Sequence, residues 1–150
     1  MRIFHALEVA ASGLTCERLR LDVIANNLAN VNTTRTPEGG PYARQMAVVA
    51  SRPADQASGF GSSGFGGSTA PAVGNGVRVV GIARDLTPPV LKYDPAHPDA
   101  DASGYVALPN VNVVTEMVDL ISATRAYEAN VTALNAIKQM MLKALEIGRA

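Results

Sequence analysis

Apolar residues recur with helical spacing at both ends of the chain. Near the N-terminus the spacing is seven residues, with a second apolar position three residues after each first one. The members are Leu7, Leu14, Leu21 and Leu28, followed by Ala10, Ile24 and Val31. This heptad pattern predicts an amphipathic helix from about residue 4 to residue 31 that packs along another helix. Glu17 takes the matching position in the second heptad, so packing should be less regular there.

The C-terminal third repeats this arrangement with alternating spacings of three and four. The predicted seam consists of Met117, Leu120, Thr124, Tyr127, Val131, Leu134, Lys138, Met141 and Leu145. We expect a helix that begins after Pro109 and ends near Gly148, since glycine favours a helix C-terminus. Helices of this length extend roughly 40 to 50 Å, so the two should form an antiparallel pair. Apolar residues left on the flanks predict further helices from other subunits.

The middle of the chain has β character and many turn residues. Residues 45–50 and 77–84 are rich in β-branched side chains, which predicts a small hairpin or sheet. Residues 58–69 are rich in glycine and serine and predict a mobile loop. Four prolines predict an extended connection to the second long helix: Pro88, Pro89, Pro95 and Pro98.

These patterns predict a mainly α fold with a small β insert, in which the terminal helices form a coiled-coil-like core. Residues 1–36 and 109–150 would supply the two helices of one discontinuous inner domain. Residues 37–108 would form a β-rich middle domain that carries the 58–69 loop. The boundaries follow the change in composition between helical and Gly/Pro-rich segments.

Composition and charge argue against several functional classes. Thirteen basic and thirteen acidic residues cancel, which argues against a nucleic-acid partner. The sequence has no run of about twenty apolar residues that would span a bilayer as a helix. The N-terminus lacks the pattern of a cleaved secretion signal. The single cysteine, Cys16, excludes an internal disulfide and favours a small core residue.

Candidate catalytic or metal chemistry is weak. Asp94, His97, Asp99 and Asp101 are possible metal ligands, but the intervening prolines favour turns in which aspartates accept backbone hydrogen bonds. Gly59, Gly61 and Gly64 match the spacing of a dinucleotide-binding loop without the strand and helix that it requires. We therefore expect no catalytic residue, no metal site, no cofactor and no small-molecule substrate.

Four asparagines near the end of the first helix require an explanation, because asparagine is a poor helix former. They are Asn26, Asn27, Asn30 and Asn32. One interpretation is capping and turn formation at the helix end. The other is that their amides form hydrogen bonds across helix contacts and fix the register. The residues alone leave these interpretations equally open.

These same residues carry a family resemblance. Ser12-Gly13-Leu14, Leu21 and residues 25–33 (ANNLANVNT) resemble the N-terminal signature of flagellar rod and hook proteins. Residues 110–121 (NVNVVTEMVDLI) and 125–130 (RAYEAN) resemble the terminal helix of that family. Residues 93–106 are similar to one subunit type of the proximal rod. The resemblance covers both ends and the segment from about residue 77 onward.

The resemblance implies a non-enzymatic axial protein that polymerises with itself and other rod subunits around an export channel and transmits torque. Its partners would include the proximal-rod neighbours and the adjoining motor base. It implies delivery to the periplasmic part of the basal body by the flagellar type III export apparatus, without signal cleavage. The expected assembly interface comprises Leu14, Leu21, Asn26, Asn27, Leu28, Asn30, Asn32, Met117, Ile121, Arg125, Tyr127, Glu128, Asn130, Val131 and Leu134.

Two alternatives belong to other functional classes. A coiled-coil adaptor or chaperone would bind client helices reversibly and form small complexes of defined size. A small metal-dependent hydrolase would use Asp94, His97, Asp99 and Asp101, and would retain stoichiometric metal after purification.

Overall fold

Two long helices and two short hairpins make up the computed structural model, which describes residues 2–52 and 75–148. The elements, in chain order, are α1 (Arg2–Ala29), β1 (Gln45–Ser51), β2 (Val77–Arg84), β3 (Val90–Tyr93), β4 (Tyr105–Leu108) and α2 (Val113–Ile147). The mainly α fold with a small β insert is confirmed. The Gly/Ser-rich loop predicted at residues 58–69 lies outside the described residues.

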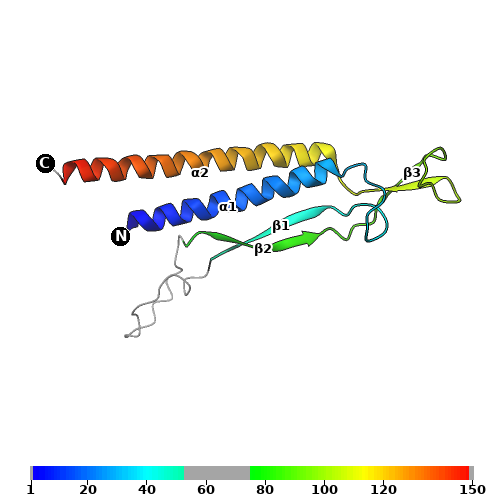
Figure 1. The fold of residues 1–150 in the computed structure, drawn as a ribbon, viewed down its shortest axis with the longest axis horizontal. Helices are drawn as coiled ribbons and strands as arrows, with labels where there is room; N and C mark the ends of the chain where they lie inside the picture. The colour runs from blue at the N-terminus through cyan, green and yellow to red at the C-terminus, as the bar shows by residue number, and fades with distance from the viewer. Residues whose placement is uncertain (1, 53–74, 149–150) are drawn as a thin grey trace, which may run out of the picture.

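The helices α1 and α2 lie side by side and antiparallel, so that both chain ends are at the same end of the molecule (Figure 1). Two contacts along the pair define its register. Asn27 near the end of α1 bonds to Glu116 in the first turn of α2, and Gly13 faces Asn130. The side chain of Asn112 caps α2 by accepting from the amides of Val114 and Thr115. The predicted helices and their pairing are confirmed.

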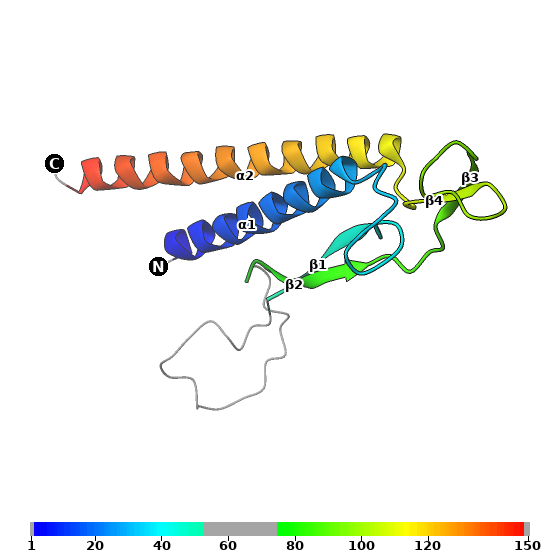
Figure 2. The same ribbon diagram turned by 45° about the vertical axis from the view of Figure 1, so that its right-hand side comes forward.

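The β1–β2 hairpin runs along α1, which therefore lies between the hairpin and α2 (Figures 1 and 2). The strands pair antiparallel with a bulge between Val48 and Val49. The hairpin is attached to α1 by the Ser12 hydroxyl, which accepts a hydrogen bond from the Val77 amide at 3.1 Å. Gly76 permits this approach, because its φ is 79° and an added Cβ would lie 2.4 Å from Ser12 Oγ. Both predicted strands are confirmed.

A second hairpin, β3–β4, occupies the segment for which the prolines predicted only an extended connection. Pro88 and Pro89 precede β3, while Pro95 and Pro98 lie in the turn between the strands, so no proline interrupts the ladder. The rings of Tyr93 and Tyr105 pack edge to face with centroids 5.3 Å apart. The prediction was therefore incomplete, because proline outside a short strand does not prevent pairing.

The segment between β3 and β4 is held by its own turns. Asp94 Oδ1 accepts from the Ala96 amide at 3.3 Å, and Asp101 Oδ1 accepts from the Ala102 amide at 2.8 Å. The imidazole Nδ1 of His97 accepts from the Asp99 amide. Hydrogen bonding of this kind confirms the turn interpretation of these residues. Across residues 2–52 and 75–148, no three histidine, cysteine or acidic side chains are grouped so that they could share a metal ion.

The buried core formed by residues 2–52 and 75–148 is small. Its apolar members are Ala10, Cys16, Val23, Ile24, Val106 and Ala123. Cys16 is a buried free cysteine, as predicted, and burial is the main cause that raises the pKa of its thiol. Neither described helix has the length and apolar character needed to cross a membrane. Large apolar side chains thus remain outside the core of the single chain.

The predicted seam of α2 is correct at five of its nine positions. Leu120, Tyr127, Val131, Leu134 and Met141 are partly buried as expected, whereas Met117, Thr124, Lys138 and Leu145 are exposed. The fully buried residues of α2 are Glu116 and Ala123. Each comes one residue before an exposed member of the predicted seam, Met117 or Thr124. The sequence pattern selected the larger apolar residues, but close approach of two helices requires small ones such as Ala123, which is 0% exposed.

Candidate assembly site

A cluster of polar side chains joins α1, the start of β1 and the start of α2. We call it the polar junction, and it consists of Asn27, Tyr42, Arg44, Gln45, Glu116 and Asp119. Glu116 and Asn27 are the largest fully buried side chains of the described residues, at 0% and 1% exposure. Buried polar groups of this size are stable only when their hydrogen-bonding atoms are satisfied.

Asn27 connects three parts of the chain through its amide. Its Nδ2 donates to the Gln45 carbonyl at 2.8 Å and to Glu116 Oε2 at 3.1 Å. Its Oδ1 accepts from the Gln45 amide at 2.9 Å and from the Tyr42 hydroxyl at 2.9 Å. Because an amide has both donors and acceptors, one asparagine can bridge a helix, a strand and a second helix.

Glu116 is paired with Arg44. The guanidinium approaches Glu116 Oε1 at 2.6 Å through both Nε and NH2, and NH2 lies 3.7 Å from Asp119 Oδ2. Arg20 of α1 lies 3.6 Å from Asp119 Oδ1. Removing one partner of a buried ion pair typically costs about 3 to 5 kcal/mol, because the other charge is left without compensation. The junction therefore strongly favours this arrangement of the three elements.

Neighbouring groups reinforce the junction. The Arg44 amide donates to Asn110 Oδ1 at 3.3 Å, which ties the residues before α2 to the start of β1. Burial is the main cause that raises the pKa of Tyr42, and the negative charge of Glu116 adds to it. Tyr42 thus keeps its proton and donates to Asn27. A cavity of about 410 Å³ borders these residues between α1, β1 and α2.

The asparagines divide between the two interpretations. Asn27 bonds across to α2, as the register interpretation predicts. Asn30 donates to the Asn26 carbonyl at 2.9 Å and to Asn26 Oδ1 at 3.0 Å, and its Oδ1 accepts from Thr33, which is the local pattern of a helix end. Asn26 also donates to the Tyr42 hydroxyl at 3.2 Å, and Asn32 is exposed.

Sequence reasoning missed Arg44, Tyr42 and Glu116. Glu116 is in the first turn of α2, where an acidic residue is ordinarily explained by the helix dipole. The available signal was its spacing, because Glu116, Ala123 and Asn130 are seven residues apart. Together they form one side of the inward face, which a search for large apolar residues passes over.

The other residues expected at an assembly interface lie in two groups. One group is partly buried within the chain and contains Leu14, Leu21, Leu28, Tyr127, Asn130, Val131 and Leu134. The other group is exposed on α2 and contains Met117, Ile121, Arg125 and Glu128. The second group is therefore more accessible to another molecule in this conformation.

An apolar surface begins in the first turns of α2. We call it the outward strip, and it consists of Val114, Met117, Val118 and Ile121, which are 71%, 51%, 62% and 56% exposed. Their spacing of three and four residues places them on one side of the helix. The inward residues Glu116 and Ala123 are fully buried, so the strip faces away from α1.

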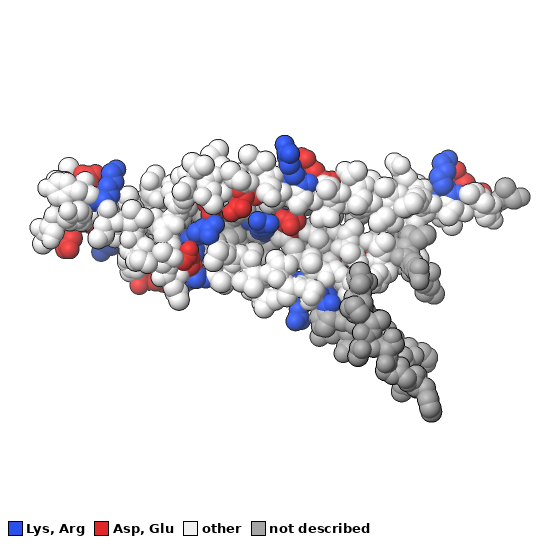
Figure 3. Space-filling model, turned by 180° about the vertical axis from the view of Figure 1, so that it is seen from behind, with Lys and Arg blue, Asp and Glu red and all other residues white. Residues whose placement is uncertain are grey.

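A second apolar surface lies at the opposite end of α2. We call it the free end, and it consists of Met140, Leu142, Leu145 and Ile147, which are 59%, 52%, 65% and 79% exposed. Charged side chains lie in the middle of the molecule and at both of its ends, with uncharged surface between them (Figure 3). Exposed apolar surface of this kind typically marks a site of protein association.

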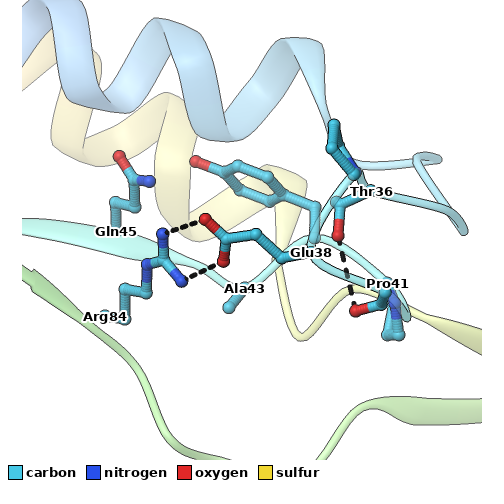
Figure 4. Close-up of a pocket in the computed structure, with 9 residues that line it drawn as sticks. Thr36, Glu38, Pro41, Ala43, Gln45 and Arg84 are labelled. Carbon is cyan, nitrogen blue, oxygen red and sulfur yellow. Dashed lines mark hydrogen bonds and ion pairs between the residues drawn. The ribbon is translucent and has the colours of Figure 1, made fainter.

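The cleft beside the junction has little capacity for chemistry. It measures about 360 Å³ and is lined by residues of the segment 36–45 together with Arg84. Glu38 and Arg84 face each other there, and each guanidinium NH2 group donates to one carboxylate oxygen (Figure 4). The hydrogen bonds from Arg84 lower the pKa of Glu38. Since these charges satisfy one another, the cleft presents no activated nucleophile or base.

Comparisons with known proteins agree with this picture of a protein built for assembly. Residues 7–35 match the family described as flagella basal body rod protein, and residues 102–147 match the family described as flagellar basal body rod FlgEFG protein C-terminal. These segments contain most of α1 and the whole of β4 and α2.

Full-length relatives narrow the family. The flagellar basal-body rod protein FlgC of Borreliella burgdorferi is 51% identical over 98% of this chain and 98% of its own length. The FlgC protein of Bacillus subtilis is 50% identical over 99% of this chain and 100% of its own. That of Escherichia coli O157:H7 is 40% identical over the same shares. The chain belongs to the FlgC family of flagellar basal-body rod proteins.

Proposed function

We propose that this chain is a structural subunit of the flagellar rod that assembles through its two terminal helices. The observation that carries the proposal is the outward strip of α2, where four neighbouring apolar side chains are each more than half exposed in the part of the chain that the structure describes. Burying such a surface against another protein is favourable at roughly 25 cal/mol per Å². The rod role itself follows from the family.

The polar junction supports the same proposal from inside the molecule. It holds α1, α2 and the β1–β2 hairpin together through buried bonds, so that the outward strip is carried on a defined surface. A subunit that transmits torque needs such internal connections, because a loosely attached hairpin would move independently of the helices. In the proposed rod, residues 1–36 and 109–150 form the inner layer around the export channel, and residues 37–108 lie outside it.

The finer partners are part of the proposal. We infer that the chain contacts copies of itself, neighbouring proximal-rod subunits and the adjoining motor base. Its delivery to the periplasmic part of the basal body would use the flagellar type III export apparatus without signal cleavage. The proposed role involves no catalysis, cofactor, small-molecule substrate or nucleic acid. The balanced charge and the self-satisfied Glu38–Arg84 pair support these last points.

Charged substitution in the outward strip tests the proposal. We expect Ile121→Asp to leave the helix content and unfolding midpoint of the isolated chain unchanged, since Ile121 is 56% exposed. The same variant should abolish rod assembly and swimming in cells that lack the natural protein, because it buries an unpaired charge in the interface. Ser122→Asp, at the next exposed position of α2, is the matched control.

Three readouts distinguish the outcomes. Normal rods and swimming with Ile121→Asp would contradict the proposed interface. Loss of swimming with an unfolded chain would be a folding defect, which circular dichroism detects. Reversible complexes of small and defined size, formed by a chain that never enters rods, would favour the adaptor alternative.

A further inference from the structure

The apolar part of the helix pair leaves the axial register ambiguous. In α1, leucine occurs at four positions that are seven residues apart: Leu7, Leu14, Leu21 and Leu28. In α2 the partly buried positions Leu120, Tyr127, Leu134 and Met141 follow the same interval. Sliding one helix past the other by seven residues would again place large apolar side chains opposite one another. Packing alone therefore discriminates weakly between registers.

The polar contacts of the pair do not repeat in this way. Asn27 meets Glu116, and Arg20 meets Asp119. Sliding α2 by one heptad in one direction would bring Glu116 level with Arg20 and would place Pro109, which precedes α2, level with Asn27. Sliding it in the other direction would carry Glu116 beyond the end of α1. Only the observed register gives the buried carboxylate both the Arg44 guanidinium and the Asn27 amide.

The hairpin moves with α1 in any such shift, because several contacts join the two. Asn27 bonds to both backbone groups of Gln45, and Ser12 accepts from the Val77 amide. Arg44 directly precedes β1, so its backbone moves with the hairpin and α1. The axial position of α2 then depends on where its buried carboxylate, Glu116, binds the groups that α1 and the hairpin present.

We propose that Asn27, Arg44 and Glu116 form a register lock, which specifies the axial position of α2 relative to α1 and the β1–β2 hairpin. A single buried polar contact is known to select register where apolar heptads do not. The lock acts as a positioning device: it fixes where the outward strip of α2 lies relative to the hairpin. That consequence rests on the proposed rod function, whereas the lock itself does not.

A distance measurement on the isolated full-length chain tests the lock. Nitroxide labels are placed on Ala11→Cys and Ser122→Cys, both at exposed positions, in a Cys16→Ala background. The parent should give one narrow distance. The double variant Arg44→Met with Glu116→Leu replaces the pair by apolar residues. It should retain the helix content and give a second population of distances between the labels. In that population the label on α2 is displaced along the helix axis by about 10 Å relative to the parent, which is the rise of seven helical residues.

Matched variants separate a positioning role from a merely structural one. Lys143→Met with Glu146→Leu removes an exposed ion pair of the same α2 helix and should leave the single distance unchanged. Arg44→Lys keeps a positive charge beside Glu116 and should retain the single distance. If the double variant fails to fold, Glu116→Gln provides the test, because it keeps the shape and an oxygen for Asn27 but removes the charge.

Specific results would overturn the lock. One is a single native distance in the folded double variant. Another is a single native distance in Glu116→Gln when the double variant is unfolded. A broad distribution in the parent chain would also contradict the lock, since the cluster would then define no register by itself. A correct lock combined with failure of Ile121→Asp to impair rods would reject the proposed interface and leave the register assignment standing.

Discussion

The two ends of the helix pair differ in what holds them. At one end α1, α2 and β1 meet in the polar junction, where Glu116 and Asn27 are completely enclosed. At the other end the last turns of α2 expose Leu145 and Ile147, and the ion pair between Lys143 and Glu146 lies within the helix itself. Both ends have apolar residues at helical spacing. Among the described residues, the junction buries its side chains against other parts of the chain, whereas the last turns of α2 stay exposed.

This difference separates two kinds of information in the sequence. Polar residues at the junction specify how the chain folds on itself, because buried hydrogen bonds and charges tolerate few geometries. Apolar residues at the free end and in the outward strip specify that something else must be bound, without determining its geometry. Substitutions at the junction should therefore disturb folding, whereas substitutions at the free end and in the outward strip should disturb assembly.

The largest effect should come from Glu116→Ala. Truncation removes the carboxylate that pairs with the partly buried Arg44 guanidinium, and it removes an acceptor for the Asn27 amide. We therefore expect the free energy of unfolding to fall by about 3 to 5 kcal/mol. Urea denaturation of the isolated chain measures the change. Glu128→Ala, an exposed acid of the same helix, should cost less than about 0.5 kcal/mol. Equal effects of the two variants would remove the distinction between the ends.

The second test concerns the inward face of α2. Ala123→Leu should lower the free energy of unfolding by about 1 to 3 kcal/mol, because the site is fully buried against α1 and has no room for three more carbons. Thr124→Leu is the matched control, since Thr124 is the neighbouring position that the apolar pattern assigned to the seam. If Thr124→Leu proved the more damaging substitution, the seam described for α2 would be wrong.

Glu17 interrupts the leucine seam of α1, and a substitution there should stabilise the chain. Its Oε2 is a buried side-chain atom without a hydrogen-bond partner among residues 2–52 and 75–148. Removing an unsatisfied buried polar atom is favourable, so Glu17→Leu should raise the free energy of unfolding by about 1 kcal/mol. Arg18→Leu changes an exposed neighbour and should have little effect on denaturation. A marked loss of stability in Glu17→Leu would mean that the carboxylate has a partner in solution.

The smallest effect on stability should come from Leu145→Ala at the free end. Leu145 is 65% exposed, so truncation should change the free energy of unfolding by less than about 0.5 kcal/mol. Rod assembly, measured by recovery of basal bodies from complemented cells, should nevertheless decline. Ala144→Ser at the adjacent exposed position serves as the control. Stability loss without an assembly defect would show that the free end is packed within the chain.

Much of the fold could be predicted from the sequence, for identifiable reasons. The helix ends at Ala29 and Ile147 and the strands at Gln45 and Val77 follow from strong local patterns of heptads, caps and β-branched residues. The β3–β4 hairpin escaped prediction because four-residue strands between prolines have little periodicity. The junction escaped because Arg44 and Glu116 are 72 positions apart, and no local pattern reveals which distant charge a buried carboxylate will meet.

Cryo-electron microscopy of purified basal bodies is the most direct test of the central claim, that the junction fixes the helix pair inside the subunit and leaves the outward strip for assembly. The account predicts rod density that fits α1 and α2 in the register set by Asn27 and Glu116, with Val114, Met117, Val118 and Ile121 against a neighbouring subunit. A subunit found in rods with this strip facing solvent, or with the two helices separated, would contradict it.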